Sequence, residues 1–185
     1  MSREKIKNFI KDLLNSLDNS KFFLDNPSVA KKDIKKFLTY TLNSFNSPKL
    51  SESDSYKLFT DGASRGNPGL SGAGFVLLDR NDNILLTGKK FLNIKTNNEA
   101  EYIALIFALE KIAEKSIKRV NIYLDSELVV KQLKGEYKVK NLRLQELYEK
   151  VKSLLEKFDF TINHVKRSEN KIADKLANEA IDEYR

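Results

Sequence analysis

Hydrophobic residues recur at helical spacing in the first part of the chain. One stripe is formed by Ile6, Phe9, Ile10, Leu13, Leu14 and Leu17, and a second by Ile34, Phe37, Leu38, Leu42 and Phe45. Between them, Asn26 and Pro27 are typical of an N-cap followed by the first helical residue. Two such helices cannot bury both stripes well alone. We therefore expect them to pack on the rest of the chain, on a partner or on a second copy.

After a polar, serine-rich linker, "NSPKLSESDS", the pattern changes to alternating strands and helices. Strands are predicted at residues 56–60, 72–78, 84–92, 120–124 and 158–165, and helices at 98–114, 127–133, 142–158 and 170–182. Short loops between the first three strands indicate an antiparallel meander. The last two strands each follow a helix, so they are expected to pair in parallel. The sequence thus predicts a helical extension at 1–50 and an α/β domain at 55–185.

Composition narrows the functional classes. A chain of 185 residues, 41% hydrophobic and 32% charged, is typical of a soluble globular protein, and its net charge of +7 fits either a polyanionic partner or a solubilising surface. The absence of cysteine excludes disulfides and thiol chemistry, and one histidine excludes sites that need two. The longest apolar run, "YIALIFAL", is too short to cross a membrane. We expect a cytoplasmic protein without a membrane partner.

Four acidic residues lie at the ends of predicted elements or on half-buried faces: Asp61, Glu101, Asp125 and Asp174. If strands 56–60 and 120–124 are parallel neighbours, Asp61 and Asp125 emerge at the same sheet edge, where open α/β sheets place their sites. Carboxylates that close repel one another unless cations hold them together. An acidic cluster without histidine or cysteine selects Mg²⁺ or Mn²⁺.

Each acid alone has a structural explanation. Asp61 is typical of a turn, and Glu101 of the acids found near a helix start. Asp125 and Ser126 are typical of a helix cap, and Asp174 of an ion pair with Lys171. In isolation we favour these explanations. The four acids together, in this order of strands and helices, favour one shared site.

From about Lys57 to its end the chain resembles the type 1 ribonuclease H family. The resemblance is carried by "TDGASRGNPG", "TNNEAEY", "YLDSELVV" and "HVKRSENKIADKLA", which match the four acidic motifs of the family in order and spacing. It implies a five-stranded mixed sheet with helices on both faces. It also implies that Asp61, Glu101, Asp125 and Asp174 are catalytic and bind two Mg²⁺ ions, with Mn²⁺ as the alternative. The implied reaction is hydrolysis of the RNA strand of RNA–DNA hybrids, which leaves 5′-phosphate and 3′-hydroxyl ends.

The resemblance also implies how the substrate is bound. Discrimination of RNA from DNA requires contacts with 2′-hydroxyl groups. These contacts fall to the glycine-rich turn, Gly62, Ala63 and Ser64, and to Glu101. Neutral donors would hold a phosphate of the DNA strand, namely Asn67, Thr96, Asn97 and Asn98. The sequence "TNN" is equally typical of a helix cap, which leaves neighbouring amides free for an anion.

The match departs from the family in the loop before Asp174. Many members carry a catalytic histidine there, but this loop is shortened to "VKRSEN". His164 alternates with Phe160 and Ile162 and is expected to be a packed residue at a strand end. We hypothesise that Arg167 takes over the role in the transition state or in product release.

A second departure concerns substrate affinity. The long basic insertion with tryptophans that some members carry is missing. The helical extension carries a basic cluster at Lys31, Lys32, Lys35 and Lys36. This cluster either binds hybrid or forms the solvated face of an element for packing or self-association, and the oligomeric state is left open. One alternative function is a related nuclease for double-stranded RNA or DNA, which the fold alone does not exclude. Another is a non-catalytic nucleic-acid-binding module, and the presence of all four acids disfavours that module.

Overall fold

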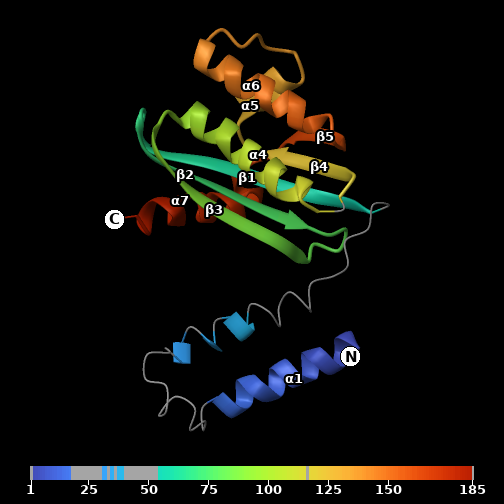
Figure 1. Ribbon diagram of the computed structural model, residues 1–185. Coiled ribbons are helices and arrows are strands. Elements are labelled where there is room, and N and C mark those ends of the chain that lie inside the picture. Colours follow the sequence, from blue (N-terminus) through green and yellow to red (C-terminus); the bar gives the residue numbers. More distant parts are fainter. Residues whose placement is uncertain are drawn as a thin grey trace. The chain divides into compact units, whose positions relative to one another are not determined.

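The computed structural model describes residues 2–17, 31–32, 34–35, 37–39, 54–115 and 117–184 (Figure 1). The chain divides into two compact units, Met1–Lys49 and Leu50–Arg185. Each unit is described separately below, beginning with the larger one.

A mixed five-stranded sheet forms the centre of the larger unit. Its strands are β1 (Ser55–Gly66), β2 (Gly69–Leu78), β3 (Ile84–Lys95), β4 (Arg119–Leu124) and β5 (Asp159–His164). They lie in the order β3-β2-β1-β4-β5. The meander β1-β2-β3 is antiparallel, whereas β1, β4 and β5 are parallel. The fold predicted from the alternation of strands and helices is confirmed.

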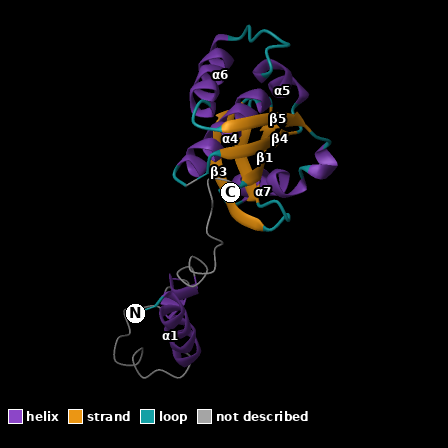
Figure 2. Ribbon diagram, turned by 90° about the vertical axis from the view of Figure 1, so that its right-hand side faces the viewer, coloured by secondary structure: helices purple, strands orange, loops and turns teal. Residues whose placement is uncertain are grey.

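Helices cover both faces of the sheet. They are α4 (Asn97–Ala113), α5 (Glu127–Leu133), α6 (Leu142–Leu155) and α7 (Lys171–Asp182), with a short 3₁₀ helix at Arg167–Glu169. Figure 1 shows α4 in front of the sheet and α7 behind it, and Figure 2 shows the strands between these two helices. The main hydrophobic core lies between the sheet and α4, α5 and α6.

Two glycines bring helix backbones unusually close to the sheet. A Cβ at Gly62 would lie 2.2 Å from the carbonyl carbon of Ala100 in α4, and a Cβ at Gly74 would lie 2.3 Å from the carbonyl oxygen of Ala173 in α7. Gly74 pairs with Asp61 across β1 and β2, and side chains along a strand alternate between faces. Successive residues of β1 therefore face α7 and α4 in turn, which allows the site to draw side chains from both layers.

Strand β1 is longer than the sequence predicted. The apolar alternation stops at Thr60, but β1 continues to Gly66, paired with β2 alone. Its pairing with β4 ends at Phe59. The glycine-rich stretch is thus the end of a hairpin whose turn is Asn67 and Pro68, and Asp61 lies within a strand rather than at its end. The remaining boundaries differ from the prediction by up to three residues.

The smaller unit contains helix α1 (Arg3–Ser16), which is capped by Ser2. From the two predicted stripes, Ile10, Leu17 and Leu38 form a small buried cluster, against which Ile6, Leu14 and Ile34 pack. Phe9 is 61% exposed, as expected for a unit too small to bury both stripes. The predicted cap at Asn26 and Pro27, as well as Leu42, Phe45 and Lys36, falls outside the described residues.

None of the helices in the described part of the chain has the length and apolar character needed to cross a membrane.

Candidate active site

The parallel pairing of β1 and β4 places two carboxylates side by side. Phe59 is level with Tyr123, so the residues two places further along, Asp61 and Asp125, reach the same point of the sheet. Asp61 is 5% exposed, and Asp125 is half-buried just beyond the end of β4. The neighbouring Ser126 caps α5, so the cap expected near Asp125 is formed by the next residue.

Helix α4 contributes the third carboxylate. Its start is fixed by a capping box, in which Thr96 accepts a hydrogen bond from the backbone N–H of Glu99, while the Glu99 carboxylate accepts one from that of Thr96. Glu101 follows in the first turns and is 5% exposed. The backbone N–H of Gly62 donates to Glu101 Oε2 at 3.3 Å, which ties this carboxylate to β1.

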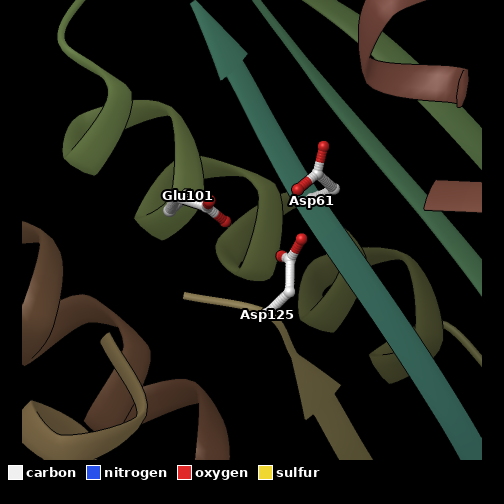
Figure 3. Close-up of side chains that lie close together, drawn as sticks. All are labelled: Asp61, Glu101 and Asp125. Atoms are coloured by element: carbon white, nitrogen blue, oxygen red, sulfur yellow. The ribbon is translucent and has the colours of Figure 1, made fainter. Parts of the chain in front are cut away.

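The three carboxylates converge on one point. Asp61, Glu101 and Asp125 each offer an oxygen within 4.8 Å of the others, and Figure 3 shows them pointing toward one another from β1, α4 and the end of β4. The fourth acid, Asp174, is not part of this group. Its Oδ1 accepts a hydrogen bond from Arg167 Nη2 at 2.5 Å, rather than pairing with Lys171 as the sequence alone suggested.

Burial and mutual repulsion make the cluster costly to ionise. Burial, and then the charges of Asp125 and Asp174, raise the pKa of Asp61 to about 7. Burial, and then the charges of Asp61 and Asp125, raise the pKa of Glu101 well above its usual range, against the opposing effect of the Gly62 N–H. Ionising all three carboxylates at neutral pH is therefore costly, and the charge of Arg167 offsets that cost only in part.

The cost of ionising Asp61 predicts how the free energy of unfolding depends on pH when no metal is bound. Asp61 ionises near pH 3.8 when unfolded but near pH 7 when folded, so rising pH favours the unfolded chain until the folded pKa is passed. The stabilisation is complete below pH 3.8 and is lost by about pH 7. We expect the free energy of unfolding by urea in EDTA to fall by about 2–3 kcal/mol between pH 5 and pH 8. Saturating Mg²⁺ at pH 8 should reverse the fall, whereas a flat profile would contradict it.

The donor set fits a hard divalent cation. Only carboxylate oxygens converge here, and oxygen ligands are those that Mg²⁺, Ca²⁺ and Mn²⁺ prefer. Among the described residues that line the surrounding pocket, Arg167 is the only cation. A bound cation would neutralise the charge that raises the pKa of Asp61 and Glu101.

The predicted substrate-binding residues lie in two neighbouring pockets. The first, of about 400 Å³, surrounds the carboxylates and is lined by Asp61, Gly62, Ala63, Ser64, Asn97, Glu101, Asp125, Ser126, Arg167 and Asn178. The second, of about 520 Å³, includes Asn67, Thr96 and Asn98. Asn67 Oδ1 accepts a hydrogen bond from the N–H of Asn97, which links the β1–β2 turn to α4. Thr96 serves as the helix cap, so the cap explanation of "TNN" holds for this residue.

His164 ends β5, as predicted, but the expectation that it is packed is wrong. Its side chain is exposed, as is Phe160, which is 38% exposed, because β5 is an edge strand and only Ile162 of the three is buried. His164 Nε2 lies 3.3 Å from the backbone oxygen of Asp125. It does not line the carboxylate pocket, whereas Arg167 does.

Sequence reasoning missed Asn170, which is 1% exposed. Its Nδ2 donates to the backbone oxygen of Thr60 at 2.9 Å and to Asp125 Oδ1 at 3.1 Å. It thereby joins the start of α7 to both strands that carry the aspartates. Asn170 directly follows the short 3₁₀ helix and precedes α7. This position gives no sequence signal for its role, because the role depends on tertiary contacts.

The chain is similar to a known protein family and to known sequences over most of its length. A family described as reverse transcriptase-like matches residues 59–180. The chain is 42% identical over 126 residues to Ribonuclease HI of Halobacterium salinarum, a segment that makes up 68% of this chain and 63% of that protein. The chain therefore spans just under two thirds of the length of this relative.

The chain is also similar to solved structures of ribonucleases H1. The crystal structure of ribonuclease H1 from Halobacterium salinarum is 41% identical, with a TM-score of 0.68, and the match covers 70% of this chain and 98% of that one. The structure of LC11 ribonuclease H1 in complex with RNA/DNA hybrid is 38% identical, with a TM-score of 0.67, and covers the same shares. Together with the four motifs and the sheet order, these matches show that the chain belongs to the type 1 ribonuclease H family.

Proposed function

We propose that this protein is an endoribonuclease that hydrolyses the RNA strand of RNA–DNA hybrids and leaves 5′-phosphate and 3′-hydroxyl ends. The observation that carries the proposal is the convergence of three carboxylates within 4.8 Å, those of the buried Asp61 and Glu101 and of the half-buried Asp125. Membership of the family supports it, as does the relative that was solved with RNA/DNA hybrid. Residues 55–185 would form the catalytic domain, and residues 1–50 an extension that either binds hybrid or packs and self-associates.

The carboxylates are proposed to hold divalent cations, with Mg²⁺ the first choice and Mn²⁺ the alternative. Bound divalent cations supply an activated water and stabilise the departing oxygen in phosphodiester hydrolysis. Asp61 would hold the cations together with Glu101 and Asp125, whose carboxylate oxygens lie within 4.8 Å of its own. Asp174 is the fourth proposed ligand, and it would exchange Arg167 for a cation as the site fills.

The pocket residues are proposed to bind the two strands differently. Gly62, Ala63 and Ser64 line the carboxylate pocket, where the RNA strand must lie for cleavage. Asn67, Thr96 and Asn98 line the neighbouring pocket, where they would contact a phosphate of the DNA strand. Asn97, which lines the carboxylate pocket and donates its N–H to Asn67, is the fourth proposed donor to that phosphate. Strand discrimination would then rest on 2′-hydroxyl contacts on one side only.

The test is cleavage of three matched duplexes: RNA–DNA hybrid, double-stranded RNA and double-stranded DNA, each with Mg²⁺ and with EDTA. Asp125→Asn serves as the inactive control, because asparagine keeps the oxygen that accepts from Asn170. We expect cleavage of the hybrid RNA strand alone, dependent on Mg²⁺. Cleavage of either other duplex would favour the related nuclease, and binding without cleavage would favour the non-catalytic module.

Arg167 and His164 give a paired prediction. Arg167 lines the carboxylate pocket and lies close enough to lower the pKa of Asp61, so Arg167→Ala should lower kcat on hybrid by about 10- to 100-fold. His164→Ala should leave kcat within about threefold, because the exposed imidazole does not reach that pocket. Single-turnover and steady-state assays separate the chemical step from product release. A His164→Ala variant that is folded but has lost most of its turnover would reverse the assignment.

A further inference from the structure

The second pocket, of about 520 Å³, joins three segments that are far apart in the sequence. The β1–β2 turn contributes Asn67, the start of α4 contributes Thr96 and Asn98, and the start of α6 contributes Asn141 and Arg143. The sequence predicted only neutral donors for a phosphate here, because nothing in it brought α6 next to the other two segments. The structure adds a cation to this set.

Of the described residues that line this pocket, Arg143 is the only positively charged one. It is the second residue of α6, and its backbone is held in place by Asn141, whose side chain accepts a hydrogen bond from the N–H of Leu144 at 3.2 Å. Among the described residues the Arg143 guanidinium has neither a hydrogen-bond acceptor nor an ion-pair partner. Its five donors are therefore available to a ligand.

The same pocket also contains a carboxylate. Glu99 accepts hydrogen bonds from the backbone N–H of Thr96 at 2.8 Å and from Thr96 Oγ1 at 2.7 Å. Its negative charge opposes the entry of any anion, so asparagine side chains alone would have to bind a phosphate against repulsion. A cation on the opposite side of the pocket removes that obstacle.

We propose that Arg143 is a substrate-binding residue that contacts a phosphate of the DNA strand in this pocket and offsets the charge of Glu99. A guanidinium can donate two parallel hydrogen bonds to phosphate oxygens, which fixes orientation as well as adding affinity. With Asn67 and Asn98 on one side and Arg143 on the other, the phosphate is held between α4 and α6. This role deepens the proposed function and rests on it.

The first test compares Arg143→Ala with Lys152→Ala, which removes an exposed cation from the same helix outside the pocket. We expect Arg143→Ala to raise KM for hybrid by about 10-fold or more, to leave kcat within about threefold, and to lower the salt dependence of binding by about one phosphate contact. Lys152→Ala should change none of these. Adding Glu99→Gln to Arg143→Ala should recover part of the loss, since glutamine keeps the capping box without the charge.

The second test locates the contact. Hybrids in which one DNA phosphate at a time is a neutral methylphosphonate should reveal, with wild-type protein, a position that raises KM by about 10-fold. Arg143→Ala should be insensitive at that position and normal elsewhere. The assignment of Arg143, but not the proposed function, would be refuted if Arg143→Ala had the KM and salt dependence of the wild type. It would also be refuted if every methylphosphonate raised the KM of Arg143→Ala as much as that of the wild type. Wild-type protein that does not cleave hybrid would refute the proposed function, and the inference with it.

Discussion

Replacement of Asp61 by asparagine is expected to abolish hybrid cleavage and, at the same time, to stabilise the metal-free protein at pH 8. Asp61 lies within 4.8 Å of both Glu101 and Asp125, so its loss removes one of the three converging ligands of the proposed site. We expect the rate of cleavage to fall by at least about 10³-fold. Cleavage assays in Mg²⁺ and in Mn²⁺ measure this effect.

The gain in stability has the same cause as the loss of activity. At pH 8 wild-type Asp61 is ionised although burial and its neighbours raise its pKa to about 7, and asparagine carries no such penalty. Urea unfolding in EDTA should show a gain of about 4 kcal/mol at pH 8, which shrinks to less than half at pH 5. Saturating Mg²⁺ should also narrow the difference, because only the wild type binds the cation well.

Asp79 provides a control, because its pKa is shifted in the opposite direction to that of Asp61. Its carboxylate accepts hydrogen bonds from Asn83 and Asn81, which hold its pKa below the usual range. Asp79→Asn should therefore give no gain at pH 8 and should keep hybrid cleavage at the wild-type rate. An Asp61→Asn variant that cleaves hybrid, or that is less stable than the wild type at pH 8, would contradict the account of the site.

The sequence was sufficient for the parts of the site that follow from element order. Asp61 and Asp125 each follow an apolar strand, and parallel pairing of those strands makes the two carboxylates neighbours without further information. The hydrophobic pattern also located every described strand and α-helix of the larger unit, but not the 3₁₀ helix at Arg167–Glu169. It failed where pairing is made by backbone alone, as in β1 after Asp61, because glycine, serine and alanine leave no alternation to detect.

Tertiary contacts supply what the sequence lacks. Asn170 shows only a helix start in the sequence, although it binds the backbone of Thr60 and the carboxylate of Asp125. Arg143 becomes a neighbour of Asn67 and Asn98 only once α6 packs on α4. The burial of His164 was predicted wrongly for a related reason: alternation in an edge strand does not reveal which positions a helix covers.

Gly62→Ala is expected to lower both the stability and the activity of the protein strongly. A Cβ there would lie 2.2 Å from both the carbonyl carbon of Ala100 and the backbone nitrogen of Glu101. These are backbone atoms, so no side-chain rotation relieves the overlap, and β1 and α4 must move apart. We expect a loss of about 3 kcal/mol or more in the free energy of unfolding, measured in urea.

The same displacement should damage catalysis independently of folding. Gly62 donates its N–H to Glu101 and adjoins Asp61, so separating β1 from α4 separates two of the three converging carboxylates. A misplacement of about 1 Å can lower a rate by about 100-fold, so the folded fraction of Gly62→Ala should cleave hybrid about 100 times more slowly. Gly135→Ala is the matched control: its backbone φ of 78° disfavours alanine by about 1 kcal/mol, but nothing lies within 4 Å of the added Cβ. Gly135→Ala should therefore lose a little stability and no activity, whereas wild-type stability and activity in Gly62→Ala would mean that β1 and α4 do not approach this closely in solution.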